Sequence, residues 1–454
     1  ENNLNNMLFR CEYGGISVHS TNHVTFNNLS FEQAVPLNNV EYDSKVDINN
    51  FYINEQGEGP DRGWDSHPDG VWTWWQIANS VVNIKNMEAK SGLRIQVYAS
   101  STLLIDNGVF DGNNYNCNFK VVNGKLKFNN VTLNNCKNEN EIGVDYDSEI
   151  SLSNSNLSNT IIVAREHVLI ELYNVQLTKD KISSSSLIMS SRLSTVRIAS
   201  SSLSSNSGYG LVSSEGDGEI SNSTFSGFSD AAISSVGNVA NSTFKISDSE
   251  FKNNGVGINT YSTNLTGERL KIHDNNIGMQ VNRGEVRISN STFENNSTMA
   301  VKNMLPVYGA AFWNNWWGDY TGPKNIRTNP LGLGGEVSNG IIFKPWYIST
   351  EMTKTNRDVV VATTTQTVEM PKTQMVIETP VVEPVIVVVT TATTTAEEKI
   401  LETTTSTIVD IVSDVVNEPI MEDSMVSTSS EPASGGVTTS EGDEVPLDDT
   451  TTQN

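Results

Sequence analysis

The segment from residue 57 to residue 75 concentrates side chains that could bind sugars. Within it, Trp72 and Trp74 alternate with Val71 and Thr73. Residues two apart on a β-strand point to the same face, so we expect the two indoles to lie side by side on the outside. Two exposed indoles form a flat apolar platform suited to stacking on sugar rings. Trp72 and Trp74 are therefore candidate ligand-binding residues, and a loop packed against a neighbouring coil is the alternative.

The same segment offers candidate metal ligands. Asp65, His67 and Asp69 recur at every second residue. Their carboxylate and imidazole groups could bind a cation such as Ca²⁺, which takes mainly oxygen ligands. Three such side chains in a loop rich in turn residues are also compatible with no ligand, so Ca²⁺ is a candidate ion and no cofactor is expected.

Acid–base chemistry and charge neutralisation could come from residues further along the chain. Arg94 and Gln96 are expected beside the tryptophan pair, followed by Lys120 and then by Asp145 and Asp147. We take Arg94, Lys120, Asp145 and Asp147 as catalytic candidates, and Arg94 and Gln96 also as ligand-binding candidates. All five can act together only if successive segments place them on one surface.

A sequence repeat supplies such segments. The pattern apolar-x-apolar-x-Asn-x-x-apolar recurs through the first 300 residues, and nine of its eleven intervals lie between 20 and 26 residues. Its fifth position falls at Asn28, Asn50, Asn86, Asn107, Asn130, Asn154, Asn174, Ser200, Asn222, Asp248, Asp274 and Asn290. Leu4, Asn6 and Phe9 fit the same register, so the first residues are expected to lie inside a coil, as in a fragment or trimmed domain.

Alternation at two residues predicts short strands, and the recurrent Asn predicts a sharp bend once per repeat. Asn tolerates the left-handed backbone conformation that such a bend requires, and stacked Asn amides can bond to one another. Two or three short strands per turn of about 22 residues describe an all-β parallel β-helix, in which each coil pairs with the next. Leucine-rich repeats have a similar period, but their L-x-x-L-x-L spacing is absent.

These repeats resemble those of right-handed parallel β-helix proteins, the pectate-lyase-like superfamily, over roughly residues 1–300. The resemblance implies a single-stranded, right-handed solenoid of about a dozen coils. In that family, acidic residues hold Ca²⁺ against uronate carboxylates and an Arg or Lys abstracts the proton α to the carboxyl group. The residue types are present at Arg94, Lys120, Asp145 and Asp147. The family's catalytic motifs are not recognisable, and no closely paired carboxylates stand out.

The chain changes character after residue 303. Residues 304–350 contain Trp316, Trp317 and Trp346 and resemble the segment that closes secreted and surface β-helix proteins, so we predict a C-terminal cap; sugar stacking by Trp316 or Trp317 is the alternative. Residues 351–454 hold 19 Asp and Glu against 4 Lys and Arg, and no aromatic residue. Such a segment cannot bury enough surface to offset its ordering entropy, so we predict a disordered, acidic stalk or linker.

Composition excludes several functions. A formal net charge of −24 makes nucleic-acid binding improbable, because phosphate neutralisation needs a basic surface. No apolar run approaches the roughly 20 residues of a membrane-spanning helix. Cys11, Cys117 and Cys136 are odd in number and match no metal spacing. We expect them to be buried or half-buried thiols, with a Cys117–Cys136 bridge as the alternative.

The fold alone does not give function. We interpret the chain as a secreted or cell-surface module without catalysis, adhesin-like or glycan-binding, whose partner is an extracellular polysaccharide. One alternative is a polysaccharide lyase or hydrolase that acts on an acidic glycan across the outer face, and another is an architectural spacer. An enzyme should show converging carboxylates and a basic side chain in one groove beside Trp72 and Trp74. A binding module should expose aromatic residues without that convergence, and a spacer should bury them.

Overall fold

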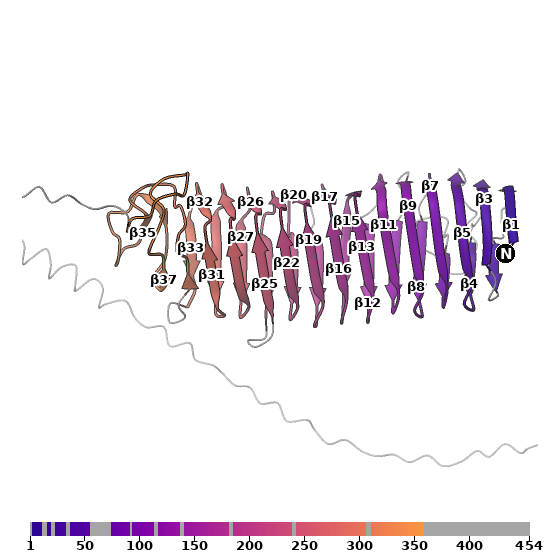
Figure 1. Cartoon of the computed structure of the whole chain (residues 1–454), viewed down its shortest axis with the longest axis horizontal. Coiled ribbons are helices and arrows are strands. Elements are labelled where there is room, and N and C mark those ends of the chain that lie inside the picture. The colour runs from indigo at the N-terminus through magenta and orange to yellow at the C-terminus, as the bar shows by residue number, and fades with distance from the viewer. Residues whose placement is uncertain are drawn as a thin grey trace, which may run out of the picture. The chain divides into compact units, whose positions relative to one another are not determined.

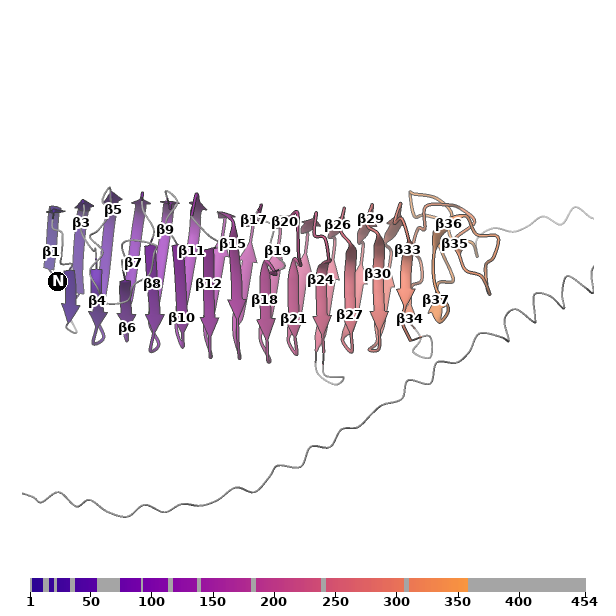
Figure 2. The same cartoon turned by 180° about the vertical axis from the view of Figure 1, so that it is seen from behind.

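The structure is a computed structural model. It describes residues 2–10, 16–19, 23–32, 37–54, 74–90, 93–112, 117–136, 140–180, 185–237, 242–305 and 310–357. Within these ranges the regular secondary structure consists of β-strands, with no α-helix (Figures 1 and 2). None of the described segments is a helix that could cross a membrane. The described residues belong to a compact unit that runs from Glu1 to Thr364.

Parallel strands stack coil upon coil, which confirms the predicted parallel β-helix (Figure 1). One face is a 13-stranded parallel sheet. Its strands are β2 (Ile16–His19), β4 (Leu37–Glu41), β6 (Trp74–Ala78), β8 (Leu93–Tyr98), β10 (Cys117–Val122), β12 (Asn140–Asp145), β15 (Thr160–Ala164), β18 (Ile188–Ser191), β21 (Leu211–Ser214), β24 (Ala231–Val236), β27 (Val256–Tyr261), β30 (Ile277–Asn282) and β33 (Met299–Asn303).

The other face is a 22-stranded sheet. Its first strands are long: β1 (Asn2–Arg10), β3 (His23–Glu32), β5 (Lys45–Asn54), β7 (Val81–Ala89), β9 (Thr102–Asp111) and β11 (Lys125–Asn134). Pairs of shorter strands follow, one pair per coil: β13 (Glu149–Ser153) and β14 (Asn156–Ser158), β16 (Leu169–Tyr173) and β17 (Gln176–Lys179), β19 (Thr195–Ala199) and β20 (Ser202–Ser205), β22 (Asp217–Ser221) and β23 (Thr224–Ser226), β25 (Thr243–Ser247) and β26 (Glu250–Lys252), β28 (Asn264–Glu268) and β29 (Lys271–His273), and β31 (Val286–Ser289) and β32 (Thr292–Glu294). β34 (Ala310–Ala311) and β37 (Ile341–Ile342) complete the sheet.

The repeat asparagines bend this second sheet. Asn28 and Asn50 have φ angles of 57° and 59°, the left-handed conformation that the sequence predicts. The Asn50 Nδ2 donates to Asn28 Oδ1 at 2.8 Å, and the Asn28 Nδ2 donates to Asn6 Oδ1 at 2.7 Å. The same amide stack continues through Asn86, Asn107 and Asn130. Bend and stacking together fix the register of each coil on the next.

Apolar repeat residues fill the interior, as the alternation predicts. Phe128 on β11 is 1% exposed, and its ring centroid lies 5.2 Å from that of Phe119 on β10 and 6.2 Å from that of Phe110 on β9. One face of each strand is therefore committed to the core. The alternate residues are left to face solvent along both sheets.

The expectation that the cysteines are thiols is wrong for two of them. Cys117, the first residue of β10, is bonded to Cys136, which follows β11. Gly112 packs against the bridge, because a Cβ at this position would lie 2.6 Å from Cys136 Sγ and 2.8 Å from Cys117 Sγ. Cys11 lies outside the described residues. The bridge ties the start of one coil to its own end.

Replacing both Cys117 and Cys136 by serine is expected to lower the free energy of unfolding by about 3 kcal/mol, because a bridge across 19 residues restricts the unfolded chain. Urea denaturation followed by circular dichroism measures the change. Reductant should destabilise the wild type and leave the double variant unaffected. Equal sensitivity of both proteins to reductant would show that the bridge does not carry this effect.

Residues 310–357 follow the last long coil. They include β35 (Pro323–Lys324) and β36 (Gly334–Glu336), which pair with each other. The Trp317 ring stacks on Phe293 with centroids 4.8 Å apart, and Trp316 Nε1 donates to Glu294 at 2.5 Å. Trp316 and Trp317 are 8% and 0% exposed, so neither offers an open face for sugar stacking. The capping role of the segment stays a prediction. Of the predicted stalk, residues 351–454, the structure describes residues 351–357, where Thr355 is bridged to Tyr347 and Asn356 donates to the Trp346 carbonyl; the remainder lies outside the described residues.

A histidine between two carboxylates makes the stability of one coil sensitive to pH. His273 on β29 contacts Asp274 Oδ2 through Nδ1 at 2.6 Å and Glu250 Oε1 through Nε2 at 3.0 Å. Partial burial lowers the pKa of His273, but the bonds to Asp274 and Glu250 outweigh it and raise that pKa above its ordinary value. Lys252 and Glu294 are the register partners of His273 on the neighbouring strands. Lys252 forms an ion pair with Glu250, and Glu294 accepts a hydrogen bond from Trp316.

Because the folded-state pKa of His273 is raised, its contribution to stability is present below pH 6 and is lost as pH rises through the raised value. We expect a loss of about 0.2–1 kcal/mol between pH 6 and pH 8, the range of partly exposed ion pairs. Thermal melts of the wild type and His273→Gln at both pH values measure it. A pH dependence that survives the substitution would contradict the assignment.

Candidate functional site

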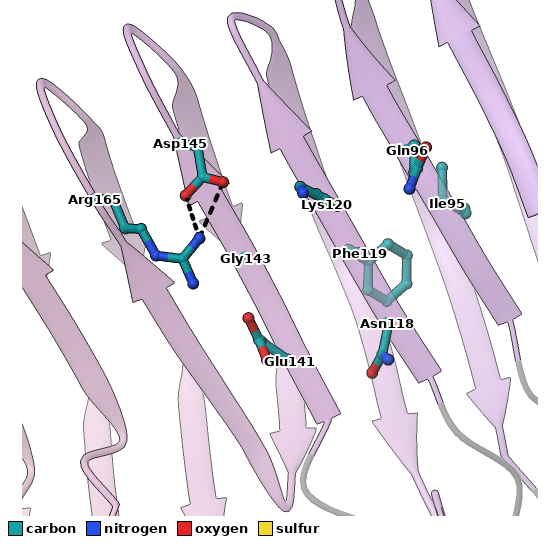
Figure 3. Close-up of a pocket in the computed structure, with 9 residues that line it drawn as sticks. All are labelled: Ile95, Gln96, Asn118, Phe119, Lys120, Glu141, Gly143, Asp145 and Arg165. Carbon is teal, nitrogen blue, oxygen red and sulfur yellow. Dashed lines mark hydrogen bonds and ion pairs between the residues drawn. The ribbon is translucent and has the colours of Figure 1, made fainter. Parts of the chain in front are cut away.

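A cavity of about 210 Å³ opens on the outer face of the 13-stranded sheet (Figure 3). We call it the Lys120 cavity. It is lined by Ile95 and Gln96 of β8, by Asn118, Phe119 and Lys120 of β10, by Glu141, Gly143 and Asp145 of β12, and by Arg165, which follows β15. Three residues proposed from the sequence, Gln96, Lys120 and Asp145, therefore lie around one hollow.

Strand register brings these residues together. Lys120 pairs with Gln96 on one side and with Gly143 on the other. The inward partners Ile95, Phe119 and Ile142 alternate with them and belong to the buried core. Adjacent parallel strands lie about 4.8 Å apart, so a row of outward residues crosses successive coils at that spacing.

Gly143 makes the floor of the cavity. It lies two residues from Glu141 and two from Asp145, at the outward position where another residue would place a side chain. A Cβ built there would come within 3.1 Å of Glu141 Oε1. The missing side chain leaves open space next to Lys120, its register partner on β10.

Asp145 is occupied by Arg165. The Arg165 Nη1 donates to both carboxylate oxygens of Asp145, at 3.0 and 3.1 Å (Figure 3). Asp145 is 6% exposed, whereas the side chain of Arg165 is 57% exposed. A buried carboxylate needs such a partner, and the guanidinium retains other N–H groups for a ligand. Asp145 thus serves to position Arg165 at the edge of the cavity.

Lys120 and Glu141 are the uncompensated charges of the cavity. Both side chains are exposed, and neither forms an ion pair or a side-chain hydrogen bond with any residue in the described ranges. Lys120 and Glu141 lie on neighbouring strands, and Asn118 is the register partner of Glu141. One free ammonium and one free carboxylate therefore face the same hollow.

The structure places the other predicted residues as follows. Trp74 of β6 pairs with Arg94 of β8, and Arg94 pairs with Asn118 of β10, so the three residues lie in one row across the sheet. The structure describes only the backbone of Trp74 and Arg94. Asp147 lies in the turn after β12 with φ of 50° and is not among the lining residues. The ligand candidate Trp72 and the metal candidates Asp65, His67 and Asp69 lie outside the described residues.

Sequence reasoning missed Glu141 and Arg165. Both could have been found by extending the alternation: Glu141 lies two outward positions before Asp145, and Arg165 follows the apolar run Ile161–Val163 of the next coil. No cluster of three or more His, Cys, Asp or Glu side chains suited to a metal occurs in the part of the chain that the structure describes.

The engagement of Asp145 argues against hydrolysis by a pair of acids. Paired-acid glycosidases need both carboxyl groups free to exchange protons. Asp145 is already bound to Arg165. Proton abstraction beside a neutralised carboxyl group suits this arrangement better.

Comparison with known proteins shows likeness of fold. No protein-family model matches the chain, and no curated protein does. The crystal structure of the periplasmic alginate epimerase AlgG is 13% identical over 64% of this chain and 75% of that chain, with a TM-score of 0.38. A single mutant of AlgG is 11% identical over 63% and 76%, with a TM-score of 0.37. A double mutant is 12% identical over 64% and 77%, with a TM-score of 0.41. The chemistry of this chain has to be derived from its own residues.

Proposed function

We propose that this protein is an enzyme that acts on an acidic polysaccharide at the Lys120 cavity. One observation carries the proposal: an unpaired lysine, an unpaired carboxylate and a held guanidinium converge on one hollow of the outer face. Converging charged groups favour an enzyme over a non-catalytic module. The cavity is small beside the roughly 300–1,000 Å³ of drug-sized pockets, which suits one sugar unit of a longer chain.

Each charged group has a role in proton abstraction. Arg165, held by Asp145, neutralises the carboxylate of a uronate unit and so stabilises the charge that develops when the α proton leaves. Lys120 releases its own proton to solvent and then takes the α proton. The electron pair forms a new carbon–carbon double bond, and the bond from the β carbon to the glycosidic oxygen breaks. Water beside Glu141 protonates the leaving oxygen.

The site of action is proposed to lie outside the cytoplasm. The Cys117–Cys136 bridge supports this, because disulfides persist in oxidising compartments and are rare in the cytosol. A periplasmic, secreted or surface-attached protein meets this condition equally. An extracellular or envelope glycan is then the accessible substrate class.

A substrate panel tests the proposal. Purified protein is incubated with polyuronates and with neutral polysaccharides, with Ca²⁺ or with a chelator, and both ultraviolet absorbance of unsaturated products and reducing ends are followed. We expect ultraviolet absorbance from unsaturated products with the polyuronates and none with the neutral polysaccharides. Loss of turnover with the chelator would support Ca²⁺, the candidate ion named from the sequence. Reducing ends without absorbance would favour a hydrolase.

Two outcomes of the panel would overturn the enzyme proposal. Retention of the protein on a polyuronate column without any turnover would favour the glycan-binding module expected from the sequence. Absence of both turnover and retention would favour the architectural spacer. Melting curves on the same preparation establish that the protein is folded in either case.

Filling the floor of the cavity is expected to reduce turnover. Gly143→Leu places an isobutyl group between Glu141 and Lys120, so kcat/KM should fall about tenfold or more as bound substrate is displaced. Gly143→Ala is the matched control: its Cβ meets only the flexible tip of Glu141, at 3.1 Å, and the loss should be smaller. Initial rates on the best polyuronate measure both. Equal activity of wild type and Gly143→Leu would place the reaction elsewhere.

A further inference from the structure

A second hollow, of about 480 Å³, lies on the 22-stranded sheet over β22, β25, β28 and β31. We call it the Lys245 groove. Outward side chains of the four strands form one of its walls in register: Glu219, Lys245, Thr266 and Arg287. The groove belongs to a different sheet and to different coils from the Lys120 cavity, so the two sites share no residue.

A second row of short polar side chains forms the opposite wall. Ser221, Ser247 and Ser289 lie two residues beyond the first row on their strands, and Glu268 completes the row on β28. Two residues of a strand span about 6.6 Å, and four parallel strands span about 14 Å. The groove therefore runs along the stacking direction and suits an extended polymer.

The other charged groups of the groove form ion pairs with residues outside it. Glu219 lies 4.0 Å from Arg197, Glu268 lies 2.7 Å from Arg269, and Arg287 is paired with Glu285. Lys245 is exposed and has no ion pair among the residues in the described ranges. Lys245 is thus the charged group of the groove that forms no ion pair, whereas Arg197 and Arg269 are shared with Glu171 and Asp248.

The chemistry of the walls selects the class of ligand. Hydroxyl groups donate and accept hydrogen bonds, which matches a ligand rich in hydroxyls. One free cation cannot supply the repeated phosphate contacts of nucleic acid. The strands around the groove are paired on both sides, so they offer no open edge for a peptide to extend. A glycan with a carboxylate near Lys245 satisfies both the charge and the hydroxyl walls.

We propose that the Lys245 groove binds a stretch of acidic polysaccharide without acting on it. The acid group of one sugar unit pairs with Lys245, and neighbouring hydroxyls bond to the serine row and to Thr266. Both carboxylates of the groove, Glu219 and Glu268, are held in ion pairs, so no free carboxylate accompanies the ammonium as in the Lys120 cavity. The proposal does not depend on turnover at that cavity.

Binding is tested in the Lys120→Ala background, where cleavage cannot confuse the measurement. Affinity electrophoresis in gels that contain polygalacturonate gives an apparent dissociation constant. Adding Lys245→Ala should weaken binding about fivefold, the size of one partly exposed charge contact. Ser247→Leu, which narrows the groove without changing charge, should weaken it as well. Fully methyl-esterified polymer should bind equally to the proteins with and without the Lys245→Ala substitution.

The matched control is Lys271→Ala on β29, since Lys271 is also an exposed lysine without an ion pair among the described residues. Circular dichroism verifies that every variant folds. Equal weakening by Lys245→Ala and Lys271→Ala would overturn the proposal in favour of unspecific charge attraction. Absence of binding by the Lys120→Ala protein would overturn it too. Neither result bears on whether the wild type cleaves its substrate, so the two proposals fail separately.

Discussion

Replacing Lys120 by alanine is expected to lower kcat/KM on a polyuronate by about 10²–10⁴-fold, the usual contribution of a general base. Lys120 carries the free amine of the Lys120 cavity, and the side chain is exposed, so its removal should leave the fold intact. Initial rates of unsaturated-product formation measure the loss. Melting temperature, measured alongside, should remain at the wild-type value.

Two further variants make the prediction specific. Lys302→Ala removes a lysine from the same outward row, at β33, eight strands and about 38 Å away, and should leave the rate unchanged. Lys120→Arg keeps the positive charge but gives up its proton less readily than an ammonium group does, so its rate should fall below that of the wild type. A fully active Lys120→Arg protein would show that the positive charge at this position is enough for the reaction.

Replacing Phe128 by alanine is expected to cost about 3–5 kcal/mol of unfolding free energy. The ring is 1% exposed and meets the rings of Phe110 and Phe119 inside the coils that carry the Lys120 cavity. Coils of a solenoid contact only their neighbours, so the loss should fall on the coils around β11. Urea denaturation gives the total, and hydrogen exchange of the β9–β13 amides gives its location.

Tyr173→Ala is the control for this prediction. Tyr173 is an aromatic residue of the same sheet, 59% exposed, and its truncation should change stability by no more than about 0.5 kcal/mol. A Phe128→Ala protein as stable as Tyr173→Ala would mean that the coils close over the vacated space. Uniform loss of protection along all coils would contradict local coupling.

The repeat made the fold predictable. Each Asn of the pattern marks the same left-handed bend, and each apolar pair marks the inward face of a strand, so a dozen copies carry the same information. An error at Ser200 or Asn222 would have been corrected by the copies on either side. The parallel arrangement follows because identical segments at a fixed period stack most simply in one direction.

The candidate site was predictable only where it follows the repeat. Gln96, Lys120 and Asp145 are outward residues of successive coils, and counting positions from the bend places them on one face. The pairing of Asp145 with Arg165 could not be read from spacing, because it depends on which side-chain rotamers reach across two strands. Glu141 was overlooked because the glycine beside it, at Gly143, gave no chemical signal in the sequence.

The cysteines also show that spacing in the sequence does not by itself predict a contact. Nineteen residues separate Cys117 from Cys136, and that number alone is compatible with thiols or with a bridge. Whether a bridge forms depends on how the coil closes. Cys117 is the first residue of β10, and Cys136 lies two residues beyond the end of β11. The path of the coil brings these two positions together. Spacing in sequence became proximity only after the path of the coil was known.

The interval of 36 residues between Asn50 and Asn86 leaves the stack undisturbed: Asn86 Nδ2 donates to Asn50 Oδ1 at 2.9 Å, and β5 and β7 pair from Lys45 and Val81 onward as neighbouring coils do elsewhere. Closing a longer loop costs little, about 0.6 kcal/mol for each doubling of its length. The connection from β5 to β6 therefore behaves as an exchangeable part. Evolution or protein engineering can replace the inserted residues and so change which molecules the neighbouring face contacts. The coils that carry this face stay the same.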